Sequence, residues 1–598
     1  MSVLQRGVLG CAAVILAFGL FAFVSLCVDD ESFGLVDLVA TVLFTLLFGW
    51  ISLSFSLSIA AALAREEAPP RKRDLPSRVS STALVMPIYN ESPVKVFSGI
   101  AAIREQLEEH GKRFSGSEPS HPSGHGTFDF YLLSDTTDVE KQREEQRLIA
   151  RVQALAPNVY YRHRTDNHQR KAGNIADFCE HWGDAYDFMI ILDADSLMSA
   201  GTITQLVARI QADEQLGILQ APPSPIGRSS VFARVQQFAS AVYGPLFTRG
   251  LALFSGDHGN YWGHNAIIRV AAFKQCCHLP VLRGFGALGG EILSHDFVEA
   301  ALMVRNGWKV RLAEDLGGSF EECPTTVRDY AKRDQRWCQG NLQHWKIALA
   351  EGFHPMSRFH LVSGILAYAM SPIWMLFLVI MGFSCFWIQQ AAKTPEPRGF
   401  GNVSWLGWSH TSLSLCLFIA AMMMLFLPKI LAVAMLMRRA DSCLDHGGRL
   451  RLFCSFLLES LLSVLFAPVN ALHHTRFLLG ACLGRHVGWG AQQRSENRIR
   501  FSDAARDGIG FTVLGCVLGI LIYRWQPSAL PWLAPVLAGW TLSIPLLALM
   551  ASTLVGRGLQ RMGLLLIAQE TQPEPIWEAQ QAWMAFLGPT AVTKRAIE

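Results

Sequence analysis

The chain has 598 residues, of which 51% are apolar and 17% are charged, and its mean hydropathy is +0.25. A chain of this size and composition is too apolar to be soluble throughout, so part of it is expected to lie in a lipid bilayer. The formal net charge of +3 comes from basic residues that gather beside apolar segments. No basic patch of the kind that binds nucleic acid is evident.

Two apolar segments near the N-terminus, residues 9–28 and 35–63, are long enough to cross roughly 30 Å of hydrocarbon. The first has a longer apolar core than a signal peptide and no evident cleavage site, so we expect it to remain as a span. Four further spans are predicted at residues 361–388, 411–437, 509–523 and 530–551.

Residues 452–484 are apolar but contain Pro468 and the polar His473 and His474. They predict either a tight hairpin of two spans or a segment that lies in the membrane interface. Basic residues are retained on the cytoplasmic side of a membrane, and they follow the second span, the fourth span and residue 484. We therefore expect an even number of crossings in 452–484, and both termini and the large middle segment in the cytoplasm.

This orientation divides the chain into four parts. They are two N-terminal spans (1–64), a cytosolic domain (65–350), a C-terminal membrane region of four to six spans (351–567) and a cytosolic tail (568–598).

Within the cytosolic domain, short apolar runs alternate with helical patterns. The predicted strands are Ala83–Ile88, Phe128–Leu133, Val159–Arg162, Phe188–Leu192 and Gly217–Gln220. The predicted helices are Val94–His110, Val139–Leu155, Lys171–Trp182 and Thr202–Asp213. This alternation predicts a mostly parallel sheet flanked by helices, with ligands at the carboxyl ends of its strands.

Polar residues follow three of these strands. Asn90 could be a helix cap and Asp135 a turn residue, or both could belong to a site. Asp193 and Asp195 are harder to explain structurally, because two carboxylates so close together at the end of an apolar strand repel unless a cation neutralises them. Carboxylate oxygens are ligands that suit Mg²⁺ or Mn²⁺.

Two later segments also carry candidate site residues. Asp296 begins a helix after the glycine-rich loop 284–290, where it either complements the helix dipole or acts as a general base on a sugar hydroxyl. Arg333, Arg336 and Trp337 precede the third span, where they are either interfacial anchors or part of the site.

In their order and spacing these motifs resemble the processive glycosyltransferases of family 2, such as cellulose, chitin and hyaluronan synthases. The resemblance covers residues 80–350 and the flanking spans, and rests on Pro87 to Glu91, Asp135, Lys171 to Asn174, Asp193 to Asp195, His295-Asp296 and Arg336-Trp337. Residues 260–269 and 293–302 look like a narrower group, the glucosyltransferase H enzymes that make osmoregulated periplasmic glucans.

The resemblance implies a GT-A-type, Rossmann-like α/β domain inserted in a polytopic helical membrane domain. It further implies UDP-glucose as donor, a metal-dependent inverting reaction, and a β-1,2-linked glucan passed through the bacterial inner membrane. The implied partners are the growing glucan, the lipid bilayer, a periplasmic glucan-modifying protein and an acyl carrier protein.

By the same resemblance, the catalytic set is Asp193 at the nucleotide, Asp195 at the metal and Asp296 as base. Asp135 would meet the uracil and Lys171 the diphosphate, His264 and Asn265 would line the acceptor side, and Arg333, Arg336 and Trp337 would hold pyrophosphate and acceptor. Pro87, Tyr89, Asn90, Glu91 and Asn174 complete the implied substrate-binding set. This chain departs from the synthases at His295, where they usually have Glu, and at Arg333, where they have Gln.

Three alternatives remain open from the sequence. One is a synthase of another polysaccharide, and a second is a transferase that moves one sugar to a polyprenyl phosphate. The third is a polysaccharide transporter, against which stand the α/β domain with its paired carboxylates and the absence of a Walker-type phosphate loop.

Overall fold

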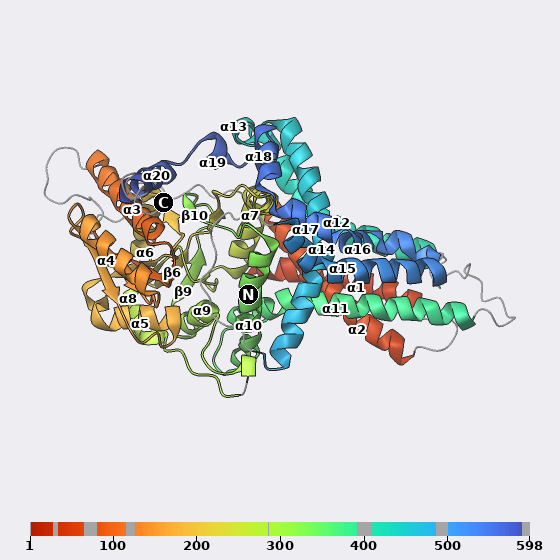
Figure 1. The fold of residues 1–598 in the computed structure, drawn as a ribbon. Coiled ribbons are helices and arrows are strands. Elements are labelled where there is room, and N and C mark those ends of the chain that lie inside the picture. Colours follow the sequence, from red (N-terminus) through yellow and green to blue (C-terminus); the bar gives the residue numbers. More distant parts are fainter. Residues whose placement is uncertain are drawn as a thin grey trace.

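The computed structural model describes residues 2–27, 34–64, 80–114, 126–284, 286–391, 410–485 and 500–588. An α/β domain occupies one end of the molecule, and long apolar helices extend away from it (Figure 1). These helices are α1 (Val3–Cys27), α2 (Leu35–Leu63), α11 (Pro355–Ala391), α12 (His410–Arg438), α15 (Phe501–Trp525) and α16 (Leu530–Thr541), which bends by 58° into α17 (Ser543–Ala551). The protein is a multi-pass membrane protein.

The α/β domain is built on a seven-stranded sheet of order β3-β2-β1-β4-β8-β6-β9. Its strands are β1 (Ser80–Ile88), β2 (Gly126–Ser134), β3 (Val159–His163), β4 (Phe188–Ile191), β6 (Leu216–Gln220), β8 (Ala266–Arg269) and β9 (Lys309–Leu312). Only β8 runs antiparallel to its neighbours, so the sheet is mostly parallel, as predicted. The five strands expected from the sequence are confirmed to within three residues at each end, whereas β8 and β9 were not predicted.

Both faces of the sheet are buried, which explains why its central strands are continuous apolar runs. Leu84 and Met86 of β1 pack in one core, whereas Ala83 and Val85 pack in the other, as the two-residue period of a strand requires. The first core is covered by α3 (Pro93–Phe114), α4 (Val139–Gln153) and α6 (Ala200–Ala212). The second is covered by α5 (Arg170–His181), α8 (Val270–Cys276) and α9 (His295–Arg305). The four predicted helices correspond to α3, α4, α5 and α6.

A second, three-stranded sheet lies beside the carboxyl end of β4. Its order is β5 (Leu197–Met198), β10 (Ser319–Glu321) and β7 (Ser224–Pro225). It joins the segment directly after Asp195 to the segment that ends in Glu321. These strands are only two or three residues long and were not predicted from the sequence.

Two long helices connect the α/β domain to the apolar helices. The first, α7 (Val231–Ser255), packs on α2 and α12, and the second, α10 (Val327–Ala348), packs on α11 and α14 (Arg449–Cys482). The apolar helices therefore contact elements that reach directly into the α/β domain.

The hairpin predicted within 452–484 is wrong, because α14 is one continuous helix. The helix tolerates Pro468, and the indole N–H of Trp540 donates to the carbonyl of that proline at 2.9 Å. By length and composition alone α14 is a candidate span.

Both ends of α14, however, contact the α/β side of the molecule. Near its start, Ser455 accepts a hydrogen bond from the backbone N–H of Leu565, which leads into the C-terminal segment, and at its end Gly484 lies against Gly286. In Figure 1, α14 runs across the direction of the apolar helices rather than along it. This arrangement favours the interfacial alternative for residues 452–484, and the number of spans stays a prediction.

The C-terminal segment is not the separate tail that the sequence suggested. After α18 (Thr553–Arg561) it forms α19 (Ala568–Thr571) and α20 (Pro575–Leu587), and α20 packs on α3. Ile576 and Leu587 are fully buried in the core of the α/β domain. Glu570 forms a two-pronged ion pair with Arg234 of α7 at 2.7 and 2.9 Å. Residues 589–598 lie outside the described part of the chain.

Candidate active site

The loop after β1 is held by its own polar side chains. Asn90 adopts a left-handed conformation (φ 57°), and its side-chain oxygen accepts the backbone N–H groups of Thr137 at 3.1 Å and Asp138 at 2.9 Å. The carboxylate of Glu91 accepts the backbone N–H of Tyr89. Asn90 therefore joins the ends of β1 and β2 and does not cap the following helix. Pro87, half-buried, is the second-last residue of β1.

Asp135, directly after β2, is buried and paired with an arginine that the sequence did not single out. Arg164 donates to both carboxylate oxygens, from Nε at 2.6 Å and from Nη2 at 2.9 Å. Burial raises the pKa of Asp135, and the hydrogen bonds and charge of Arg164 oppose that rise. A planar two-pronged pair of this kind fixes the carboxylate geometrically.

Lys171, in the first turn of α5, bridges two parts of the site. Its ammonium group donates to the carboxylate of Asp193, which follows β4, and to the carbonyl of Gly263 at 2.8 Å. The turn that carries Asp193 is closed by Ser196, whose hydroxyl accepts the backbone N–H of Asp193 at 2.9 Å. Lys171 and Asp193 are 22% and 37% exposed, so both can meet a ligand.

Asp296 lies against Gly263, the residue that Lys171 holds. A Cβ at Gly263 would come within 3.3 Å of Oδ2 of Asp296, and Gly263 also has a positive φ of 85°, so only glycine fits here. Burial raises the pKa of Asp296, and the charge of Glu299 adds to this, while His295 and Lys171 oppose it. A partly buried carboxylate with a raised pKa has the properties of a general base.

A group of charged side chains lies near Asp195, including four that could not be recognised from the sequence. Glu322 pairs with both Lys95 of α3 and Arg228, and the charge of Asp195 acts on Lys95. Burial raises the pKa of Glu321, and the charges of Asp195 and Asp193 add to the rise, against His264 and Arg333.

These carboxylates fit a divalent cation as part of a larger ligand set. Among the described residues, no three His, Cys, Asp or Glu side chains are gathered closely enough to hold a metal by themselves. Asp193 and Asp195 nevertheless lie close enough to Glu321 for their charges to raise its pKa. Their oxygens suit Mg²⁺ or Mn²⁺ when ligand oxygens complete the coordination shell.

Two of the predicted substrate-binding residues are instead structural. Asn174 is fully buried, and its amide donates to the carbonyl of Leu133 at 3.0 Å. Asn265 is also fully buried, and its amide donates to the hydroxyl of Ser319 at 2.9 Å. Their assignment as ligands is therefore corrected, because neither side chain can touch a substrate in this structure.

His264, in contrast, faces the site. Its Nε2 lies 3.4 Å from the carboxylate of Glu321, and its Nδ1 lies 3.4 Å from the hydroxyl of Ser196. His264 thus links the turn that carries Asp193 to β10.

On α10, Arg333 and Trp337 form a pair, and Arg336 follows on the same helix. The guanidinium of Arg333 lies 4.5 Å from the centre of the Trp337 ring, a cation–π contact, and Trp337 is 49% exposed. Because the charge of Arg333 reaches Glu321, this pair lies on the side of α10 that faces the carboxylates. Arg336 is half-buried one helical turn after Arg333.

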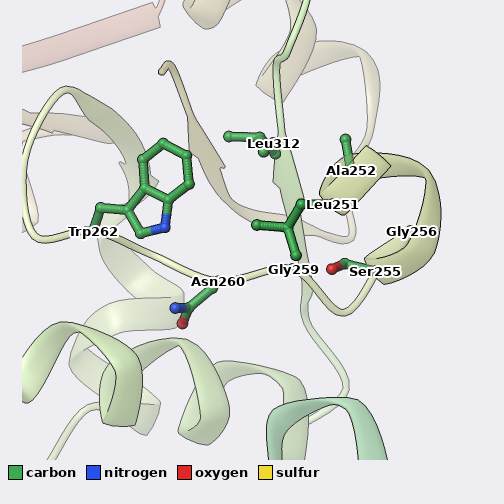
Figure 2. Close-up of a pocket in the computed structure, with 8 residues that line it drawn as sticks. All are labelled: Leu251, Ala252, Ser255, Gly256, Gly259, Asn260, Trp262 and Leu312. Atoms are coloured by element: carbon green, nitrogen blue, oxygen red, sulfur yellow. The ribbon is translucent and has the colours of Figure 1, made fainter. Parts of the chain in front are cut away.

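A small pocket adjoins Gly263. In Figure 2, Leu251 of α7 and Leu312 of β9 point toward the indole of Trp262, above the stretch from Gly259 to Asn260. The backbone N–H of Trp262 donates to Gln220 at 2.9 Å, which fixes the loop. Trp262, half-buried, directly precedes Gly263 in this loop.

Comparison with known proteins shows which family this chain is related to. The family description "Glycosyl transferase family group 2" matches residues 188–437. A glucans biosynthesis glucosyltransferase H from Vibrio cholerae is 39% identical over 590 residues, which cover 96% of this chain and 78% of the relative. Another, from Shewanella oneidensis, is 40% identical over 554 residues, which cover 91% of this chain and 74% of the relative.

Among solved structures, a mannosyltransferase from Pyrobaculum calidifontis in complex with GDP-Man and Mn²⁺ is similar at 15% identity and a TM-score of 0.40. The similarity covers 67% of this chain and 98% of that one.

The fold and the family match define a membrane-integrated glycosyltransferase of family 2, with a GT-A-type α/β domain between membrane helices, as predicted. The chain belongs to the glucans biosynthesis glucosyltransferase H family.

Proposed function

We propose that this enzyme polymerises glucose from UDP-glucose into the β-1,2-linked backbone of osmoregulated periplasmic glucans, by a single inverting displacement. Asp296 takes the proton from the acceptor hydroxyl, and the freed oxygen forms the new bond to the anomeric carbon. The bond from that carbon to the UDP oxygen breaks, and its electron pair leaves with UDP.

One observation carries this proposal: Lys171 joins the two halves of the site. Its ammonium bonds Asp193 on the nucleotide side and the carbonyl of Gly263, against which Asp296 packs. The residue proposed to meet the donor diphosphate thus also fixes the distance from the donor to the base, as an in-line displacement requires.

The remaining donor contacts follow from position. Asp135, oriented by Arg164, and the loop from Tyr89 to Glu91 lie at the carboxyl ends of β2 and β1, where a nucleotide binds in α/β sheets. Asp195 would hold Mg²⁺ or Mn²⁺, which supplies electrostatic stabilisation of the departing diphosphate.

On the other side of the site, the proposed acceptor contacts gather around Asp296. Arg333 and Arg336 supply positive charge on α10, while His264 and Trp337 flank the growing glucan.

We place the enzyme in the bacterial inner membrane with the α/β domain in the cytoplasm, because basic residues gather at the ends of the membrane helices on that side. The product would then pass between the helices to the periplasm, where a glucan-modifying protein would receive it. An acyl carrier protein remains an expected partner from the family resemblance.

The test uses purified protein in nanodiscs with Mg²⁺ and radiolabelled UDP-glucose, UDP-N-acetylglucosamine or UDP-galactose. We expect UDP release with UDP-glucose alone and a product that only β-1,2-specific glucanases digest. Turnover with another donor would assign the enzyme to a different polysaccharide. An organic-extractable product would identify a polyprenyl-phosphate transferase, and sugar transport without UDP release would contradict the proposal altogether.

A further inference from the structure

A buried pair of side chains lies directly beside the proposed base. His295 and Glu299 are one helical turn apart on α9, and Nδ1 of His295 donates to Oε1 of Glu299 at 2.9 Å. The two residues are 8% and 2% exposed, so bulk water does not solvate the charge of either side chain. A carboxylate buried to this degree is stable as an ion only when a partner supplies positive charge.

Negative side chains outnumber positive ones in this part of α9. Two carboxylates, Asp296 and Glu299, lie on this helix, and the imidazole of His295 bonds the second of them. Lys171 bonds Asp193, although its charge also acts on Asp296. Like charges at this spacing raise the cost of ionising each other. Burial lowers the pKa of His295, but the charges of Glu299 and Asp296 outweigh burial and raise it above its ordinary value.

The other titratable groups that face α9 do not replace this charge. Tyr261, Cys277 and Cys179 lie near Glu299, and burial raises the pKa of each, so they are neutral. His344 of α10 bonds the carbonyl of Ser294 at 3.0 Å, and burial lowers its pKa to about 4, so it too is neutral.

We propose that His295 is a positioning residue for the base: its imidazolium, hydrogen-bonded to Glu299, neutralises that buried carboxylate, so that the charge of Glu299 does not oppose the ionisation of Asp296. This inference rests on the proposed role of Asp296. It also accounts for histidine at the place where the related synthases carry an acid, because at this position of α9 the acid is supplied one turn later.

The sign of the pH dependence follows from this arrangement. Asp296 accepts a proton only as a carboxylate, so activity is lost as the pH falls through its raised pKa. His295→Gln leaves Glu299 without a counter-charge and should move the acid limb of kcat/KM to higher pH, by about one pH unit, the size of shift that a nearby charge produces. Glu299→Gln removes a negative charge and should move the limb to lower pH. The double variant removes both charges and should return the limb close to that of the unmodified enzyme.

Tyr261→Phe is the matched control, because it removes a fully buried hydroxyl near Asp296 without changing any charge, and it should leave the limb in place. UDP binding, measured on every variant, shows that the donor side is intact. If His295→Gln does not bind UDP, the opposite shift in Glu299→Gln and the return in the double variant still decide the question.

The inference would be overturned if the acid limb of kcat/KM lay at the same pH in all variants while turnover fell equally in each. His295 and Glu299 would then contribute only to packing. Asp296→Asn separates this failure from that of the proposed function. If Asp296→Asn keeps near-normal turnover, the base assignment itself is wrong. If it is inactive while the limb does not move, only the role of His295 and Glu299 is wrong.

Discussion

The donor side of the site, from β1 to β4, and the acceptor side, from β8 to α10, hold their side chains by different means. On the donor side the partners come from the same edge of the sheet, as in the pair of Asp135 and Arg164. On the acceptor side the partners come from α11 and α14, which pack on α10. The carboxylate of Asp334 on α10 accepts a hydrogen bond from the hydroxyl of Tyr368 of α11 at 3.0 Å and another from Nε2 of His474 of α14 at 2.7 Å. The donor side can therefore form within the α/β domain, whereas the acceptor side is positioned by the membrane region.

The largest effect is expected for the proposed base, Asp296, on the acceptor side. Asp296→Asn should lower turnover by about 10²- to 10⁴-fold, the usual contribution of a general base, because the amide cannot take the proton. UDP affinity should be unchanged, since the donor side does not depend on this residue. Steady-state UDP release and UDP titration measure the two quantities, with Glu180→Gln, an exposed carboxylate on α5, as control. Near-normal turnover would contradict the assignment.

Asp195→Asn should affect the donor side instead. Loss of a group that stabilises developing charge costs about 10²- to 10³-fold in turnover. We also expect UDP binding to lose its dependence on Mg²⁺, because the amide is a poorer ligand for the cation. UDP titration with and without Mg²⁺ measures this, and an unchanged Mg²⁺ effect would remove Asp195 from the metal site.

Lys171→Met should affect both sides, because the lysine bridges them. Hydrogen bonds to charged groups contribute about 1.5–3 kcal/mol, so UDP affinity should fall roughly 10- to 100-fold. Turnover at saturating donor should fall as well, because Gly263 and Asp296 lose their tie to Asp193. Lys274→Met removes a lysine whose partner, Asp184, is 86% exposed, and it should change neither quantity. A loss of affinity alone would mean that the bridge does not position the base.

The smallest effect on chemistry is expected at Asp334, under the acceptor side. Asp334→Ala leaves two buried donors without an acceptor, at about 1–3 kcal/mol each, so the thermal midpoint should fall. Turnover should fall modestly at unchanged UDP affinity, because only α10 loses its anchor. Tyr368→Phe removes only one of the two hydrogen bonds and leaves Asp334 bonded to His474, so it should cost less. Equal losses of UDP affinity and turnover would show that the donor side also depends on the membrane helices.

The same contrast explains what the sequence could and could not predict. The strands β1, β2 and β4 are continuous apolar runs that end in polar residues, so both the strands and the site at their ends could be predicted from local pattern. Arg164 was missed because a basic residue in a loop gives no sign of its partner, and it meets Asp135 only once β2 and β3 pair.

The acceptor side was harder to predict because its elements are defined by distant contacts. The strands β8 to β10 are three or four residues long and pair with segments far away in sequence. Glu321 lies at the end of one of these short strands, so nothing in the neighbouring sequence marked it as a site residue. Asn174 and Asn265 were predicted as ligands from the family resemblance, yet in this structure the amide of Asn174 donates to a buried backbone carbonyl and that of Asn265 to a buried hydroxyl.

The most direct test of this account is a structure determined by electron microscopy with UDP and Mn²⁺ bound in nanodiscs. We expect the uracil beside Asp135, the cation on Asp195, Lys171 in contact with the diphosphate, and the carboxylate of Asp296 free of metal and facing the side of the donor opposite UDP. A nucleotide bound away from the ends of β1, β2 and β4, or a cation held by Asp296, would contradict it.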